Sequence, residues 1–215
     1  MKLLRRTAAV VFALLVVALL ALHLRIQHLV HLPVPGDRPA QLAAAEVWYF
    51  AYGSNMSSRY LYNVRGVLPA ASEAGVLADH EVVYLGPGIN LLEPAFAYLV
   101  KAQGKQAHGV LHRVSTEDLN RVKESEGPEY VWVNVPVQTA GGEPVQAQTL
   151  LRLSRGTPAT PSRRYVDLLV EGATEQGLPA RYVAELKALP AAYVPVASEV
   201  LGDLIMGVVM RRSAR

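Results

Sequence analysis

The chain has no cysteine among its 215 residues, so disulfide bonds, thiolate metal sites and a cysteine nucleophile are excluded. It also lacks the patterns of several common sites. Its six histidines form no HExxH or similar ligand pair, and no glycine-rich loop carries the lysine of a phosphate-binding P-loop. Gly53 and Ser54 lack the second flanking glycine of a nucleophile elbow. We therefore expect neither a metal site nor a P-loop.

A basic surface for nucleic acid is also missing, although the formal net charge is +3. Five basic residues and one acid precede Glu46, so the positive charge belongs to the amino-terminal segment. From Glu46 onward, 16 basic and 17 acidic residues leave the chain close to neutral. Domains that bind nucleic acid carry clustered positive charge, so no nucleic-acid partner is expected.

Residues 7–24 form a stretch of low polarity. As a helix it would reach roughly 27 Å, close to the hydrocarbon thickness of a bilayer. We predict an uncleaved signal anchor here, after a basic segment at 1–6 and before a proline-rich tether at 25–45. The basic residues before the span place the amino terminus in the cytoplasm and the domain at 46–215 on the other side of the membrane. Secretion after signal cleavage is the alternative.

The part of the chain after the tether predicts one α+β domain with a mainly antiparallel sheet. Alternating or β-branched segments predict strands at 75–85, 95–101 and 109–114, and a hairpin that joins 130–138 to 145–153. Serine caps and glycine or proline breaks predict helices at 56–65, 116–127, 162–176, 180–189 and 198–209.

Residues 49–55 run from an aromatic strand pattern into a small polar turn. Tyrosine and phenylalanine suit a half-buried strand, whereas Gly53 permits backbone angles and close approaches that a Cβ would block. Ser54 and Asn55 add hydrogen-bonding groups where a helix begins. The simple interpretation is a strand that ends in a turn. The functional one is a turn whose backbone N–H groups bind a ligand.

Three acids, Glu124, Glu126 and Glu129, lie where a predicted helix gives way to the next strand. Such acids are ordinarily solvated. Gly127 and Pro128 force a turn directly after Glu126, so its carboxylate can point inward. An inward carboxylate beside apolar strands has a raised pKa and can act as a general base or acid.

Four segments taken in order resemble the gamma-glutamylcyclotransferase family. They are Tyr-Phe-Ala-Tyr-Gly-Ser-Asn at 49–55, Gly-Val at 109–110, the stretch from Leu119-Asn120 through Glu124-Ser125-Glu126-Gly127 to Tyr130-Val131, and the stretch from Tyr165 through Gly172-Ala173 and Gly177-Leu178-Pro179 to Tyr182. Each motif alone is weak. Their order and spacing cover essentially everything after Glu46 and make the resemblance specific.

The resemblance implies a small, mainly antiparallel β-barrel flanked by helices, with Glu126 as the catalytic residue. It also implies a substrate cavity formed by Tyr49, Phe50, Ala51, Tyr52, Gly53, Ser54, Asn55 and Tyr130. The implied substrate is a small gamma-glutamyl compound whose α-amine attacks its own γ-carbonyl. This reaction releases 5-oxoproline and an amino acid or amine, and it needs no metal or cofactor.

Two departures from the family leave the leaving group open. Leu150 stands where relatives often carry a tyrosine that faces the cavity, and the loop at 85–94 has no obvious counterpart. Two other functions therefore remain: a module that binds a gamma-glutamyl ligand without turnover, and an enzyme acting on gamma-glutamyl groups of larger molecules. The oligomeric state is open as well.

Overall fold

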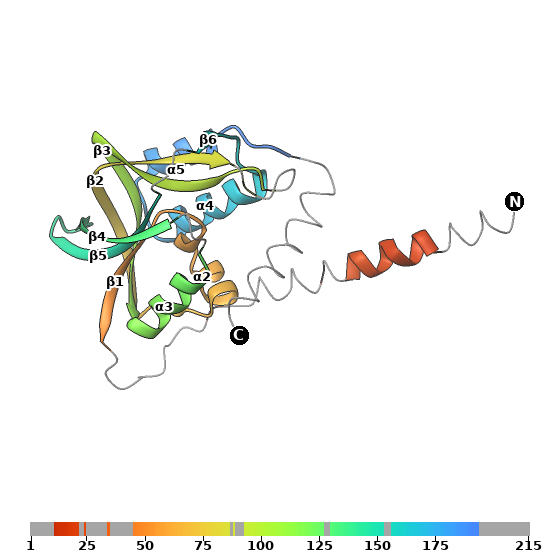
Figure 1. Ribbon diagram of the computed structural model, residues 1–215, viewed down its shortest axis with the longest axis horizontal. Helices are drawn as coiled ribbons and strands as arrows, with labels where there is room; N and C mark the ends of the chain where they lie inside the picture. The colour runs from red at the N-terminus through yellow and green to blue at the C-terminus, as the bar shows by residue number, and fades with distance from the viewer. Residues whose placement is uncertain are drawn as a thin grey trace, which may run out of the picture.

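Five strands close into a barrel in the computed structural model, which describes residues 11–21, 24, 34, 45–86, 88, 93–126, 130–152 and 156–193 (Figure 1). The strand order β3-β1-β5-β4-β2 returns to β3 because β2 also pairs with β3, and β6 extends the sheet beside β2. Among these strands only β1 and β5 pair in parallel. The strands are β1 (Glu46–Ala51), β2 (Ala71–Gly86), β3 (Phe96–Ser115), β4 (Tyr130–Thr139), β5 (Pro144–Arg152) and β6 (Thr157–Pro158). The predicted mainly antiparallel barrel is confirmed.

The helices pack around this barrel (Figure 1), and three of them, α2, α3 and α4, begin at serine caps. Ser57, Ser115 and Ser162 each accept a hydrogen bond from the backbone N–H three residues later, which satisfies an otherwise unpaired donor. The helices are the 3₁₀ turn η1 (Ser54–Met56), α2 (Ser58–Arg65), α3 (Thr116–Glu124), α4 (Arg163–Glu175) and α5 (Ala180–Lys187). The helix predicted at 198–209 lies outside the described residues.

One strand differs from its prediction. The segments predicted at 95–101 and 109–114 are two parts of the single long β3. Its register against β2 passes from His80↔Lys101 to Ala78↔Gln106, so residues 102–105 bulge out between them. Gly104 adopts φ 75° there and donates its N–H to Asp79 Oδ1 at 2.8 Å. The polar, glycine-containing stretch that looked like a loop is a bulge within one strand.

The predicted membrane-spanning helix over 7–24 is not confirmed. Residues 11–21 are helical (Figure 1). Within the part of the chain that the structure describes, however, no helix is both long and apolar enough to cross a membrane. Most of the tether predicted at 25–45 lies outside the described residues.

The ends of α2 and α3 lie next to each other at one end of the barrel (Figure 1). Arg121 of α3 donates to the carbonyl of Gly66, which ends α2 with φ 68°. This contact holds the residues that follow α3 close to the last turn of α2. The fold thereby brings the turn after β1 and the segment around Glu126 to one place.

Candidate active site

A cavity of about 190 Å³ opens where the end of β1, the ends of α2 and α3, and the starts of β3 and β4 converge. Seven of the residues indicated by the sequence line it: Tyr49, Tyr52, Gly53, Ser54, Asn55, Glu126 and Tyr130. Phe50 and Ala51 do not. They are 0% and 1% exposed in the barrel core, and the Phe50 ring lies so close to Gly109 that a Cβ there would meet it at 2.7 Å.

Glu126 forms an ion pair with Arg65, with 3.0 Å between Glu126 Oε1 and Arg65 Nη2. The side chains are only 15% and 5% exposed. Arg65 also donates to the carbonyl of Ser125 at 3.4 Å. Burial lowers the pKa of Arg65, whereas the negative charge of Glu126 and the nearby tyrosines raise it. Together the raising influences exceed the effect of burial, so the pKa of Arg65 lies above its ordinary value. The guanidinium therefore stays charged beside Glu126.

Asn55 holds this pair in position and does not leave its side chain free for a ligand. Its Nδ2 donates to Tyr49 Oη at 2.9 Å, and its Oδ1 accepts from Arg65 Nε at 3.3 Å. The side chain thus links the turn after β1 to the last residue of α2. Asn55 also lines the cavity. Because its side chain is engaged in these two hydrogen bonds, its backbone is the part available to a ligand.

His112 fixes the backbone of the same turn from inside the barrel. Its Nε2 donates to the carbonyl of Asn55 at 3.0 Å, and its Nδ1 lies 2.8 Å from Ser72 Oγ, which donates to it. A carbonyl can only accept, so the imidazole carries its proton on Nε2. Burial lowers the pKa of His112 from 6.5 to about 4. It is neutral at physiological pH.

Four tyrosines of the cavity are neutral hydroxyls. Burial is the main cause that raises the pKa of Tyr49, Tyr52, Tyr130 and Tyr165. The negative charge of Glu126 raises each of these pKa values further. Glu126 and these four tyrosines line the same cavity.

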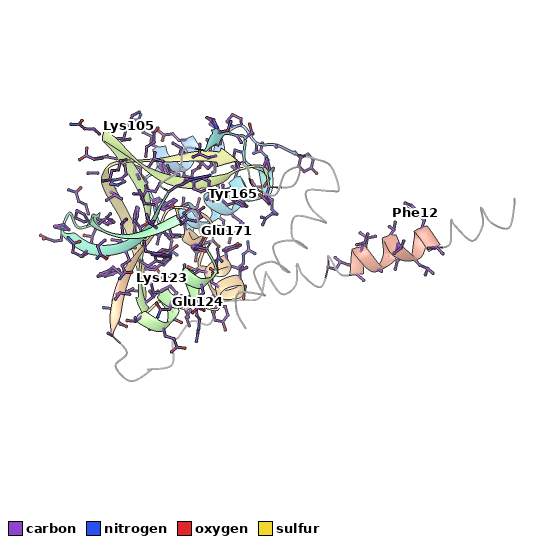
Figure 2. All side chains as sticks on the ribbon, viewed as in Figure 1. Phe12, Lys105, Lys123, Glu124, Tyr165 and Glu171 are labelled. Atoms are coloured by element: carbon purple, nitrogen blue, oxygen red, sulfur yellow. The ribbon has the colours of Figure 1, made fainter. Side chains whose placement is uncertain are left out.

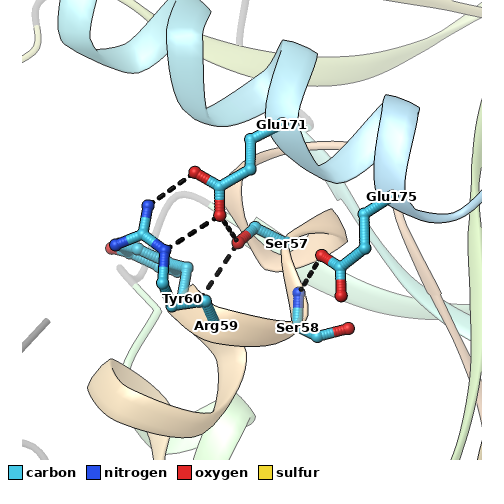
Figure 3. A network of polar contacts seen from close by, with 6 residues as sticks. All are labelled: Ser57, Ser58, Arg59, Tyr60, Glu171 and Glu175. Atoms are coloured by element: carbon cyan, nitrogen blue, oxygen red, sulfur yellow. Dashed lines mark hydrogen bonds and ion pairs between the residues drawn. The ribbon is translucent and has the colours of Figure 1, made fainter. Parts of the chain in front are cut away.

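Two glutamates of α4 clamp the start of α2, as Figure 3 shows. Glu171 accepts hydrogen bonds from Ser57 Oγ at 3.0 Å and from the guanidinium of Arg59. Glu175 accepts from the backbone N–H of Ser58 at 3.1 Å. Charge-assisted bonds of this kind are stronger than neutral ones, so α4 fixes the path of the chain directly after η1.

Glycines allow α4 and the turn after β1 to pack closely. A Cβ on Gly172 would lie 2.5 Å from the backbone N of Ser57, so α4 can pack on this turn only with glycine there. Gly53 has φ −116°, and its need for glycine comes from proximity: a Cβ would meet Tyr165 Oη at 3.2 Å. The close approach expected at Gly53 is present.

Further residues line the cavity that the sequence interpretation did not select. They are Arg65, Phe96, Ala97, Tyr98, Ser125, Leu150 and Tyr165. Arg65 gave no signal, because a basic residue in the last turn of a helix is ordinary. The strand pattern around Tyr98 shows alternation but cannot say which face meets the turn. Leu150, singled out as a departure, adds apolar surface to the cavity wall.

The remaining acids have ordinary positions. Glu124 is exposed on the outside of α3 (Figure 2), and Glu129 lies outside the described residues. Among the residues that are described, no three of His, Asp and Glu gather closely enough to hold a metal ion. The described lining residues therefore offer the chemistry of one carboxylate, one guanidinium, tyrosine hydroxyls and backbone amides.

Comparison with known proteins points to one family. A sequence model of the AIG2-like family matches residues 106–186. The gamma-glutamyl cyclotransferase verK of Clonostachys rogersoniana is 30% identical over 146 residues, which cover 56% of this chain and 81% of that protein. The chain belongs to the gamma-glutamylcyclotransferase family. The human gamma-glutamylcyclotransferase is 29% identical over 164 residues, covering 73% of this chain and 86% of the human protein.

A solved structure of a gamma-glutamyl cyclotransferase superposes with a TM-score of 0.63 at 26% identity. It covers 75% of this chain and 98% of its own. The family predicted from the four ordered motifs is thus confirmed, together with the gamma-glutamylcyclotransferase fold. The chain is an enzyme of this family.

Proposed function

We propose that this chain is a gamma-glutamyl cyclotransferase that releases 5-oxoproline from a gamma-glutamyl amino acid or amine. One observation carries the proposal: the carboxylate of Glu126 and the turn at Gly53, Ser54 and Asn55 line the same small cavity. An acid on a helix end would otherwise be solvated. Here it is 15% exposed and faces a turn that follows a buried strand.

The charges of the cavity suit the gamma-glutamyl group, which carries one ammonium and one carboxylate. Glu126 receives the α-ammonium. The internal hydrogen bonds of the turn are donated by Met56 to the carbonyl of Gly53 and by Ser57 to that of Ser54. The preceding amides, at Ser54 and Asn55, are directed to the substrate's oxygens.

The reaction then needs little beyond folding the substrate and moving protons. The α-nitrogen forms a bond to the γ-carbon, and the bond from that carbon to the leaving nitrogen breaks. Glu126 takes one proton from the α-ammonium to free the attacking amine, and a second from the same nitrogen once it has bonded to the γ-carbon. Glu126 passes both in turn to the leaving nitrogen, which departs as an ammonium, so no proton is gained or lost overall. Because nucleophile and carbonyl belong to one molecule, holding them in contact supplies much of the rate acceleration.

Arg65 acts in this scheme as a positioning residue. Its guanidinium fixes one carboxylate oxygen of Glu126 at 3.0 Å and stabilises the ionised form, which is the form that accepts a proton.

The proposal is tested by incubating the purified chain with gamma-glutamyl dipeptides, glutathione and gamma-glutamyl amines and measuring 5-oxoproline by mass spectrometry. Product from at least one of them supports it. A binding module without turnover would raise the melting temperature with these compounds and form no product. An enzyme for larger molecules would act only when the gamma-glutamyl group is attached to a bulky carrier.

A further inference from the structure

A second cavity lies beside the first and is larger, with a volume of about 710 Å³. It is a groove between β2, β3 and the segment from Gly156 to Pro161, which we call the β2 groove. Its lining residues are Val83, Tyr84, Leu85, Val100, Arg152, Gly156, Pro158, Ala159, Thr160, Pro161, Leu189 and Pro190. Arg152 is the only charged one among them. As far as the described residues line it, the groove is therefore apolar with one cation.

The strand register joins the groove to the candidate active site. Tyr98 and Tyr130 line the active-site cavity, and their register partners are Val83 and Arg152, which line the groove. Side chains of register partners in antiparallel strands lie next to each other on the same face. Tyr98 and Tyr130 thus each have a groove residue as an immediate neighbour.

Ring contacts form the boundary between the two spaces. The rings of Tyr98 and Tyr130 stack with centroids 5.2 Å apart and an angle of 15° between their planes. The guanidinium carbon of Arg152 lies 4.1 Å from the centroid of Tyr98. The stacked rings and the guanidinium of Arg152 therefore lie between the cavity and the apolar wall around Val83.

The two volumes indicate why a substrate would use both spaces. Ligand pockets usually measure about 300–1,000 Å³, so a cavity of 190 Å³ is small for a whole gamma-glutamyl dipeptide. Its acid and guanidinium suit the glutamyl part. The part beyond the scissile bond has to extend outward, and the β2 groove is the adjoining space.

We propose that the β2 groove is the leaving-group subsite and that it selects leaving groups with an apolar side chain and a carboxylate. This inference rests on the proposed function. The apolar wall receives the side chain, and Arg152 receives the carboxylate that the second residue of a gamma-glutamyl dipeptide carries. Arginine binds carboxylates through paired N–H donors. Gamma-glutamyl leucine or phenylalanine is the matching substrate class.

The test compares kcat/KM for two substrates that differ only in that carboxylate, gamma-glutamyl phenylalanine and gamma-glutamyl phenethylamine. The wild-type chain should prefer the first by about tenfold, the size of one charge-assisted contact. Arg152→Met should abolish this preference through a higher KM for the dipeptide. If the substitution also disturbs Tyr98, kcat/KM should fall equally for both substrates and their ratio should stay unchanged. A change in the ratio therefore reports on the subsite alone.

Two further variants complete the experiment. Thr160→Trp fills the groove from its exposed rim and should lower kcat/KM for gamma-glutamyl phenylalanine while sparing gamma-glutamyl glycine. Lys105→Met removes a cation from the β3 bulge, well apart from Tyr165 (Figure 2), and should change no ratio.

The experiment distinguishes failure of the proposed activity from failure of the proposed subsite. If no substrate yields 5-oxoproline, the proposed function fails. If product forms but neither Arg152→Met nor Thr160→Trp changes the substrate ratios, the subsite is wrong and the groove serves another occupant, such as a second copy of this chain.

Discussion

Arg65 Nη2 and Glu126 Oε1 lie 3.0 Å apart at the edge of the candidate active site, and both side chains are largely withdrawn from solvent. The pair joins the last residue of α2 to the second residue after α3. Glu126 thereby gains a fixed position and a neighbouring cation that favours its ionised form. This relationship gives the most specific prediction about the residues around Glu126.

Replacing Arg65 by methionine should move the acidic limb of the pH profile of kcat/KM to higher pH. Removing the cation that lies 3.0 Å from Glu126 Oε1 disfavours the ionised carboxylate, so less of it is present at neutral pH. Activity should fall at pH 7 and recover in part at higher pH. Arg65→Lys should keep the limb closer to that of the wild type.

The matched control is Arg59→Met, which removes a cation from the same helix but breaks the more exposed pair with Glu171. It should leave the pH profile in place. If Arg65→Met lowers kcat/KM equally at every pH, Arg65 serves only the fold and its positioning role is wrong.

His112 should make the protein less stable as the pH falls. Its pKa is about 4 in the folded chain against 6.5 for an ordinary histidine, so the unfolded chain binds more protons between these values. Stability is fully present above pH 6.5 and is lost as the pH falls toward 4. The shift corresponds to a loss of about 3 kcal/mol in the free energy of unfolding.

Urea denaturation at pH 7.5 and 4.5 measures this loss. His112→Gln can still donate to the carbonyl of Asn55 and should lose less stability between the two pH values than the wild type. His80→Gln, a change on β2 away from the cavity, should lose as much as the wild type. Equal losses for His112→Gln and the wild type would contradict the role assigned to His112.

Gly172→Ala should destabilise the fold, although alanine favours a helix by about 1 kcal/mol over glycine. The added methyl would lie 2.5 Å from the N of Ser57 and 2.8 Å from Cβ of Met56. Relieving this overlap pushes α4 away from the turn and should cost about 1–3 kcal/mol net. Thermal unfolding measures the change.

Thr174→Ala is the control, because it adds helix propensity on the exposed side of the same helix. It should raise the melting temperature slightly or leave it unchanged. A Gly172→Ala variant as stable as the wild type would show that the packing of α4 on this turn tolerates a side chain.

Local signals predicted much of the fold. Ser115 and Ser162 begin α3 and α4 as their capping patterns indicate, and the strand pattern after Tyr130 forms the predicted hairpin with β5. These features depend on neighbours in the chain. The union of two predicted strands into β3 was missed because the contact between Gly104 and Asp79 joins residues 25 positions apart.

The site was only partly predictable, because contacts between residues far apart in the chain leave no local signal in the sequence. Residues 49–55 and Glu126 carry motifs, so the sequence could select them. Arg65 and Tyr98 carry none, and their importance comes from tertiary contacts with Glu126 and Tyr130. Phe50 belongs to the motif but does not line the cavity. Its side chain packs in the barrel core against Gly109.

The most direct test of the central claim is the rate of 5-oxoproline formation by Glu126→Gln compared with Glu124→Gln. Both changes remove one negative charge near the end of α3, but only Glu126 lines the cavity. With folding checked by thermal unfolding, Glu126→Gln should lower kcat by about 100-fold or more, the usual contribution of a positioned general base. Glu124→Gln should keep the wild-type rate. Retention of the wild-type rate by Glu126→Gln would contradict the proposed mechanism.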